Sequence, residues 1–313
     1  MNFVLALLLG VTARGGQAVH AHCNGPVARH DSSPRDTSPL PATEKSALDD
    51  FYIAMGGPDW LVRAGWDTKS DPCGVPTWFG IKCKSNTTGI NASESSTDHV
   101  ISISLADNHL DGTLPDTLSN LHLLEHLELS SSTTVARNTI RGGIPSTLCG
   151  LTQLSKLELR STNISSTLPP CFAQLFNLES FDMSENPALC GPIPSMCELR
   201  RLKSIVLSET SLSGSLEDCI SNCVHLKNLD MRNGPSLTGT IPLSLCSLSH
   251  LSVIHLDQAG LSGSLPFCLG NNQDRLAKVT FQYNSLDGSI PESLCSSRTS
   301  LQEIDVGNNA LTG

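Results

Sequence analysis

Residues 103–115 read ISLADNHLDGTLP, and this pattern, Leu-x-Leu-x-x-Asn-x-Leu-x-Gly-x-Ile-Pro, recurs about nine times between Val100 and the end of the chain. The second leucine position advances by 24, 30, 24, 24, 24, 25, 25 and 25 residues from copy to copy. Such a period predicts a solenoid, because each unit buries its apolar face only by stacking on its neighbours. We therefore expect residues 99–313 to form an α/β solenoid. It would be a right-handed superhelix with one parallel β-sheet on the concave face.

One repeat is longer than its neighbours. Its 30-residue step exceeds the 24-residue steps by six residues, which fall at 132–137. Insertions in a solenoid become loops on one face, often the binding face. A tolerated surface insertion is the alternative.

The composition excludes several classes of function. Aromatic residues make up 4% and charged residues 16% of the chain, and the formal net charge is -10. An acidic chain without a basic stripe does not suit the phosphate backbone of nucleic acid. The sequence also lacks a phosphate-binding glycine loop and a Gly-x-Ser-x-Gly elbow. We expect no enzyme activity, no catalytic residue, no cofactor and no metal.

The string HLLEH at residues 122–126 matches the His-x-x-Glu-His pattern of one class of zinc peptidases. In that class a helix presents both histidines to the metal. Here Leu121, Leu124 and Leu127 take the buried positions of the repeat, so the string runs from a convex segment into a strand. Its histidines therefore diverge, and we do not expect a zinc site.

The amino-terminal residues indicate secretion. Residues 1–21 predict a signal peptide, because the apolar run 3–11 is followed by small residues at Val19 and Ala21. An uncleaved anchor is the alternative, since no basic residue precedes the run. Residues 22–43 are rich in Pro, Ser and Arg and predict a disordered linker. No later run reaches the roughly 18 apolar residues of a membrane span, so we expect an extracellular chain, bound to a membrane only through an anchor beyond residue 313.

Residues 44–84 predict a cap on the first coil. Apolar residues recur at helical spacing over residues 47–55 and stop at a glycine pair. All the tryptophans and two cysteines follow: Trp60, Trp66, Trp78, Cys73 and Cys83. A small aromatic cap stapled by a Cys73–Cys83 disulfide would shield the open end of the solenoid. Residues 85–98 are rich in Ser and Thr and predict an exposed loop.

Two stretches of this cap resemble a known family. Residues 48–60, LDDFYIAMGGPDW, and residues 71–83, DPCGVPTWFGIKC, look like the amino-terminal cap of plant-type leucine-rich-repeat extracellular domains. The Gly-x-Ile-Pro repeats behind them are similar to the same family, so the resemblance covers residues 44–313. The family includes receptor-kinase ectodomains, receptor-like proteins without kinases and secreted inhibitors such as polygalacturonase-inhibiting proteins. The resemblance therefore implies recognition without identifying the ligand.

The cysteines of the repeats alternate between two positions, and three pairs share a spacing of 22 residues. Adjacent strands lie roughly 4.8 Å apart, which suits the Cα separation of roughly 4.4 to 6.8 Å in a disulfide. We predict the pairs Cys149–Cys171, Cys197–Cys219 and Cys246–Cys268. The alternative is that cysteine merely fills a small, half-buried position.

Four cysteines remain: Cys23, Cys190, Cys223 and Cys295. Cys223 stands where other repeats have leucine, which predicts a small buried apolar residue rather than a reactive thiol. Cys295 belongs to the set whose partners lie 22 residues on, and the chain ends at Gly313. Because the last repeat is also incomplete, we expect the chain to be a fragment of a longer protein.

The outward middle position of successive strands is acidic in five of nine repeats. With its charged neighbours this column is the predicted ligand-binding face. The candidate residues are Glu128, Lys156, Glu158, Arg160, Asp182, Asp230, Arg232, His255, Lys278 and Tyr283. Mixed charge suits a polar peptide, protein or glycan. The alternative is a solvated strand face, since the family template commonly has Asp at the middle position.

Asn86, Asn91 and Asn163 begin Asn-x-Ser/Thr sequons and are predicted glycosylation sites in a secreted chain. Together these features predict a non-enzymatic extracellular recognition module, part of a receptor or receptor-like protein. Its partner would be a protein, peptide or glycan. A secreted inhibitor of an extracellular hydrolase is one alternative, and a cell-wall or adhesion component is another.

Overall fold

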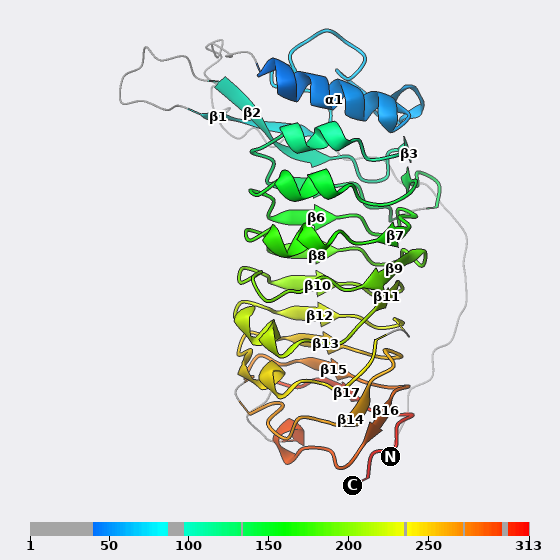
Figure 1. Cartoon of the computed structure of the whole chain (residues 1–313), viewed down its shortest axis with the longest axis vertical. Helices are drawn as coiled ribbons and strands as arrows, with labels where there is room; N and C mark the ends of the chain where they lie inside the picture. The colour runs from blue at the N-terminus through cyan, green and yellow to red at the C-terminus, as the bar shows by residue number, and fades with distance from the viewer. Residues whose placement is uncertain are drawn as a thin grey trace, which may run out of the picture. The chain divides into compact units, whose positions relative to one another are not determined.

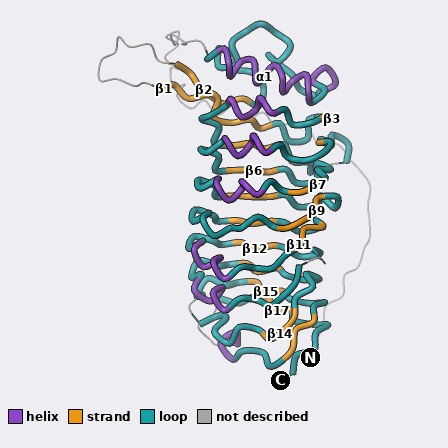
Figure 2. Tube along the Cα trace, viewed as in Figure 1, coloured by secondary structure: helices purple, strands orange, loops and turns teal. Residues whose placement is uncertain are grey.

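The computed structural model describes residues 40–86, 97–132, 134–234, 237–271, 273–295 and 300–312. These residues belong to one compact unit, residues 37–313. They form a stack of coils under an amino-terminal cap (Figures 1 and 2). The predicted signal peptide, residues 1–21, lies outside the described residues, as does the predicted linker up to residue 39. The predicted α/β solenoid with a cap is confirmed.

Ten strands of the described chain form the main sheet. In spatial order they are β1 (Ile81–Asn86), β2 (Thr97–Ser104), β4 (His126–Glu128), β6 (Lys156–Glu158), β8 (Ser180–Asp182), β10 (Ser204–Val206), β12 (Asn228–Asp230), β13 (Val253–His255), β15 (Lys278–Thr280) and β17 (Glu303–Asp305). From β2 onward the strands are parallel. We number the coils 1 to 9 by these strands, from β2 to β17.

The strands are short because each repeat supplies only one inward residue between two outward ones. Leu127, for example, is fully buried at the centre of β4, between the outward-facing His126 and Glu128. Strand side chains alternate with a period of two residues, so the central apolar residue of every coil enters the same core. Stacking these residues makes one continuous leucine-rich core from the cap into coil 8.

Most coils return through a short second strand and a 3-10 helix. The second strands form three small sheets: β3 (Asp111–Gly112) with β5 (Thr139–Ile140); β7 (Ser166–Thr167), β9 (Leu189–Pro192) and β11 (Ser211–Ser213); and β14 (Ser262–Ser264) with β16 (Ser285–Asp287). The 3-10 helices of the coils are η2 (Asp116–Asn120), η3 (Ser146–Gly150), η4 (Pro170–Gln174), η5 (Asp218–Asn222), η6 (Leu243–Ser247) and η7 (Glu292–Cys295).

Coil 4 lacks this 3-10 helix. From the proline to the next core leucine, coil 2 spans Pro145 to Leu151, whereas coil 4 spans only Pro194 to Leu199. That segment is one residue shorter than its counterpart, and a turn in which the Leu199 N–H donates to the Met196 carbonyl takes the place of the 3-10 helix. The shortening opens the packing between coils 4 and 5.

Buried asparagines join neighbouring coils. Asn186 is fully buried, and its amide accepts from the backbone N–H groups of Thr162 and Ile164 at 3.1 and 3.0 Å. It donates to the carbonyl of Leu159, in the preceding coil, at 2.9 Å. Asn138, Asn284 and Asn309 also donate to the preceding coil. By contrast, Thr210 takes the same position in coil 5 and donates to the carbonyl of Leu207, in its own coil.

The cap combines a helix with an aromatic cluster. The helix α1 (Ala42–Ala54) begins two residues before the predicted boundary and is followed by Gly56, in the left-handed region with φ 70°, and by η1 (Gly57–Asp59). Its Phe51 packs against Trp60 and Trp66 at centroid distances of 6.0 and 6.1 Å. No helix in the described part of the chain has both the length and the hydropathy to cross a membrane.

The predicted loop over residues 85–98 is wrong at both ends. Residues 81–86 form β1, which pairs antiparallel with β2, so that Asn86 lies opposite Thr97. The sheet is therefore extended by a hairpin whose tip, residues 87–96, lies outside the described part. The hairpin is joined to α1 by Glu44, which accepts from the Val100 N–H at 2.9 Å and contacts His99 Nδ1 at 2.6 Å.

Four disulfides staple the structure at the predicted pairs. The Cys73–Cys83 bond lies in the cap. The others, Cys149–Cys171, Cys197–Cys219 and Cys246–Cys268, join coils 2 and 3, 4 and 5, and 6 and 7, with Cα separations of 5.9, 5.0 and 5.8 Å. Successive coils are thus linked in pairs.

Three further cysteines of the described chain are unpaired, and they differ in exposure. Cys190 and Cys295 are exposed, whereas Cys223 is fully buried. Burial raises the pKa of the Cys223 thiol to about 11, so roughly one part in a thousand is thiolate at about pH 8. We expect iodoacetamide to alkylate Cys190 and Cys295 in the native protein and Cys223 only after unfolding. Peptide mass spectrometry measures this directly, and alkylation of Cys223 as fast as Cys190 would contradict it.

Candidate functional site

The outward side chains of the main sheet form one aligned surface. We define the strand face by four positions of each coil: the middle position, which is the outward residue between the two core residues of the Leu-x-Leu pattern; the residue two before it; and the residues two and three after it. The middle position reads Ser104, Glu128, Glu158, Asp182, Val206, Asp230, His255, Thr280 and Asp305, and consecutive members are register partners. The predicted column is therefore continuous.

Acidic residues dominate the strand face. In the nine coils, these four positions hold ten acidic and four basic residues. The acidic residues are Asp107, Glu128, Glu158, Asp182, Glu185, Glu209, Asp230, Asp257, Glu303 and Asp305; the basic residues are Lys156, Arg160, Arg232 and Lys278. The surface is therefore suited to a polar partner with a positive charge.

A first cluster of charges lies on coils 2 and 3. The Lys156 ammonium lies between two carboxylates, 3.6 Å from Glu128 and 3.0 Å from Glu158. Partial burial lowers the pKa of Lys156, but hydrogen bonds and attraction from Glu158 and Glu128 outweigh it, so the pKa is raised. One cation shared by two carboxylates leaves this cluster with a net negative charge.

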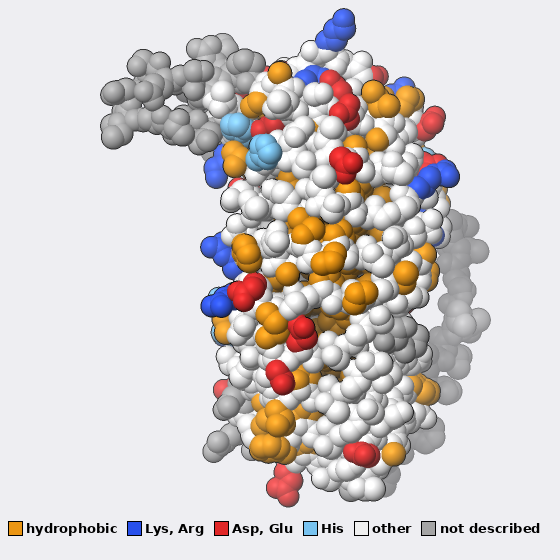
Figure 3. Space-filling model, viewed as in Figure 1, with side chains coloured by type: hydrophobic (Ala, Val, Ile, Leu, Met, Phe, Trp, Pro, Cys, Tyr) orange, Lys and Arg blue, Asp and Glu red, His pale blue; other side chains and the backbone are white. Residues whose placement is uncertain are grey.

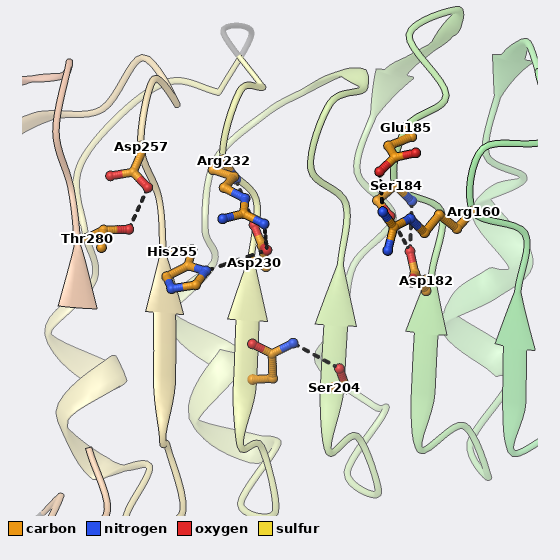
Figure 4. Close-up of polar contacts among 11 residues, drawn as sticks. Arg160, Asp182, Ser184, Glu185, Ser204, Asp230, Arg232, His255, Asp257 and Thr280 are labelled. Carbon is orange, nitrogen blue, oxygen red and sulfur yellow. Dashed lines mark hydrogen bonds and ion pairs between the residues drawn. The ribbon is translucent and has the colours of Figure 1, made fainter. Parts of the chain in front are cut away.

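Arg160 extends this cluster to coil 4. Its guanidinium donates to Glu185 (Figure 4). That hydrogen bond is the main reason that the pKa of Arg160 is raised, with smaller contributions from Asp182 and Glu209. Sequence reasoning missed Glu185 and Glu209. Both occupy the third position after the strand middle, where the backbone is left-handed at φ 57°, and an alignment of the repeats at that position could have found them.

The aspartates of the middle column also hold their own turns. Asp182 Oδ1 accepts from the backbone N–H and the hydroxyl of Ser184, at 2.9 and 2.6 Å. Asp230 and Asp305 accept likewise from the backbone two residues on, at 3.3 and 3.0 Å. An aspartate that satisfies a backbone donor in this way stabilises the end of the strand. Glu128 and Glu158, in contrast, project their carboxylates toward Lys156.

A second cluster lies on coils 6 and 7. Asp230 is only 6% exposed, and its Oδ2 lies 3.3 Å from Arg232 and 3.6 Å from His255 Nδ1. All three point toward one another from adjacent strand ends (Figure 4). The neighbouring Asp257, also missed from the sequence, accepts from the Thr280 hydroxyl at 2.5 Å. The predicted residues Asp230, Arg232 and His255 are therefore brought together.

The remaining predicted residues stand apart from these clusters. Lys278 pairs with Glu303 at 3.0 Å on the first strand position of coils 8 and 9. Tyr283 is 54% exposed at the left-handed turn of coil 8. Both lie on coil 8, directly beside coil 7, and the ten candidates are spread over coils 2 to 8 rather than gathered in a single compact pocket.

The insertion at residues 132–137 rims the strand face beside coils 1 to 3. The Ser132 backbone N–H donates to Asp107 at 2.8 Å, and the Ala136 carbonyl accepts from the His109 N–H at 3.3 Å. Arg137 Nε reaches the Ser161 carbonyl, in the next coil, at 3.2 Å. These contacts hold the insertion over the coil edges and leave Val135 83% exposed.

The string at residues 122–126 runs from a turn into β4, so the structure contains no helix to present its histidines together. A different cluster, Cys197, Glu217 and Cys219, brings three potential metal ligands within 4.8 Å. Its cysteines are joined as a disulfide and offer no thiolate. Of the predicted glycosylation sites, Asn163 is exposed, while Asn91 and the side chain of Asn86 lie outside the described residues.

Comparisons with known proteins agree with this architecture. A family model described as Leucine Rich Repeat matches residues 99–121, and a search of curated proteins finds no match. Among solved structures, the plant peptide hormone receptor RGFR1 in complex with RGF2 is 34% identical, with a TM-score of 0.58, over 64% of this chain and 30% of that one.

Two further structures match over more of the chain. The Arabidopsis receptor kinase HAESA ectodomain, in complex with an IDA peptide hormone, is 25% identical, with a TM-score of 0.68, over 86% of this chain and 41% of that one. The chain thus spans less than half of either receptor. A plant ice-binding protein, 23% identical, shares the fold, with a TM-score of 0.64 over 88% of each chain. The repeat match, the cap and the stacked coils show a leucine-rich-repeat solenoid that is similar to the ectodomains of these plant receptors.

Proposed function

We propose that the chain is a non-enzymatic, extracellular recognition module that holds a peptide or protein segment along its strand face, as part of a receptor-like protein. The observation that carries this proposal is the in-register column of the main sheet, with its excess of acidic over basic side chains. The receptor structures similar to this chain contain peptide hormones, which supports a peptide ligand.

The charges indicate what kind of peptide would bind. A ligand across coils 2 to 7 would meet the Lys156 cluster first and the Asp230 cluster second, with the uncharged Val206 of coil 5 between them. Desolvating carboxylates without a cationic partner is costly, so the ligand would carry basic groups opposite both clusters. An extended, polar, cationic segment meets these requirements better than an acidic one.

The test is binding of matched synthetic peptide pools, one cationic and one anionic, to the immobilised protein. We expect the cationic pool to be retained, and Glu128→Lys with Glu158→Lys to weaken its binding by roughly tenfold or more. These two glutamates are chosen because, unlike Asp182, they hold no backbone turn. Glu198→Lys with Asp274→Lys makes the same charge change on exposed turns away from the strand face and should leave retention unaltered.

Equal retention of both pools, or equal loss in the two double variants, would remove the strand face from the proposal. The inhibitor alternative is tested separately, since a hydrolase inhibitor would lower the rate of an extracellular polygalacturonase when mixed with it. If the Glu128→Lys, Glu158→Lys double variant still inhibits the polygalacturonase, the inhibitor function would be favoured over peptide recognition on the strand face.

A further inference from the structure

The one-residue shortening of coil 4 leaves a cavity between coils 4 and 5. In coils 1 to 3, 5, 6 and 8 a 3-10 helix follows the proline position, whereas coils 4 and 7 have only a turn, and in coil 4 the segment is also one residue shorter. The cavity has a volume of about 200 Å³. For comparison, an engineered apolar cavity of roughly 150 Å³ in another protein binds benzene. The space is thus large enough for a six-membered ring with a short side chain.

The walls of the cavity are mainly apolar. They include Ile193, Met196, Leu216, Ile220 and Met231, of which the last four are at most 8% exposed. A smaller void of about 10 Å³ lies behind it and shares Ile193 and Met231. Figure 3 shows apolar side chains gathered on the visible face near β9 and β11, among few charged ones. Methionine side chains adapt their shape readily, so two of them in one wall suit a pocket that accepts a guest.

One carboxylate, on an exposed side chain, lies at the edge of this apolar space. Glu217 stands where coils 1 to 4 and 6 to 8 have the proline of the Leu-Pro or Ile-Pro pair. Its Oε2 accepts from the Ser195 hydroxyl at 2.6 Å and lies 3.3 and 3.4 Å from the sulfurs of Cys197 and Cys219. Because these sulfurs form a disulfide, they have no proton to donate. Within the described part of the chain, Glu217 has no basic side chain in ion-pair distance.

A carboxylate at an apolar cavity is complementary to one class of molecule. We propose that this cavity binds a small organic ammonium ion, with its apolar body among Met196, Ile220 and Met231 and its N–H groups donated to Glu217. Glu217 is exposed in the free protein, so the ammonium would pair with it at the mouth of the cavity, while the apolar body would leave water for the apolar wall. Two departures from the repeat, the missing residue of coil 4 and the missing proline of coil 5, meet at this site.

The test uses the protein with its disulfides intact and three ring compounds of similar size: 2-phenylethylammonium, 3-phenylpropionate and benzyl alcohol. Calorimetry should show saturable binding of the ammonium compound, with the other two binding roughly tenfold more weakly, as expected from one charge-assisted hydrogen bond. With the methionine methyls labelled for NMR, the signals of Met196 and Met231 should move, while that of Met55, in the cap, should not.

Two substitutions of Glu217 separate charge from folding. Glu217→Gln keeps an acceptor for Ser195 without the charge, and Glu217→Pro restores the repeat pattern. Proline is compatible with the backbone, since Glu217 has φ −75° and ψ 145° and Pro242 has φ −70° and ψ 141°. Both variants should bind the ammonium compound about tenfold more weakly, while Glu198→Gln, on the neighbouring turn, should bind it normally.

Several results would overturn the proposal: no saturable binding of 2-phenylethylammonium, equal affinity for all three compounds, unaltered affinity in both Glu217 variants, or signal changes at Met55 rather than at Met196 and Met231. The cavity is separate from the strand face. Peptide retention in the Glu217 variants should therefore equal that of the unaltered protein, and the two functions can fail independently.

Discussion

Replacing Asn186 with leucine is expected to destabilise the protein by about 4 kcal/mol or more. The side chain is fully buried and joins coil 4 to coil 3. Leucine has a similar size but would leave the N–H groups of Thr162 and Ile164 and the carbonyls of Leu159 and Met183 without their partner. Each buried group that loses its hydrogen bond costs roughly 1 to 3 kcal/mol. Denaturant unfolding followed by circular dichroism measures the loss.

The chain itself provides the matched control. Thr162 and Thr210 occupy the equivalent position in coils 3 and 5 and donate to the carbonyl three residues earlier. Asn186→Thr should therefore keep the bond to Met183 and lose about half as much stability. Hydrogen exchange should accelerate at Thr162 and Ile164 in both variants, since solenoid coils open locally. If the free energy of unfolding of Asn186→Leu lies within about 1 kcal/mol of that of the unaltered protein, the asparagine does not hold the coils together.

Removing one inter-coil disulfide should cost nearly as much. Cys149→Ser with Cys171→Ser opens a link with a sequence separation of 22 residues, for which the loss of chain entropy on closure corresponds to about 3 kcal/mol. The expected result is a lower denaturation midpoint, with the largest increase in hydrogen exchange in coils 2 and 3. Cys149 is 8% exposed, so the serine hydroxyl adds a small penalty in the same direction.

The matched control is Cys190→Ser. This cysteine is exposed and unpaired, so its substitution should leave the midpoint unaltered. If the double variant retains the stability of the unaltered protein, the bond is redundant with the packing around Leu148 and Phe172, and the entropic account does not apply here.

Periodicity explains how much of the structure was predictable. The repeat placed Glu128 and Glu158 on the same outward row because every strand follows the same register. The same periodicity predicted the disulfide between Cys149 and Cys171 from their 22-residue spacing, since equivalent positions in adjacent coils must lie close together. In a solenoid each coil contacts its neighbours, so sequence spacing converts directly into distance.

The features that were missed are those that do not repeat. The hairpin of β1 and β2 joins residues across a stretch with no leucine pattern, so its pairing left no periodic signal. A different reason applies to Glu185, which does occupy a repeat position: it lies in the turn after its strand, outside the alternating strand pattern, and its contact with Arg160 spans two coils. The cavity arises because one residue is absent, and a missing residue shows its effect only when neighbouring coils are packed together.

The alternation of the disulfides also determines how the solenoid would respond to mechanical force. Coils 2 and 3, 4 and 5, and 6 and 7 are covalent pairs, whereas coils 3 and 4 and coils 5 and 6 meet without a disulfide. Under tension the chain between Cys149 and Cys171 cannot lengthen, and the same holds for the other two loops. Stretching would therefore separate the molecule into two-coil blocks. The boundaries between coils 3 and 4 and between coils 5 and 6, which no disulfide crosses, would open first.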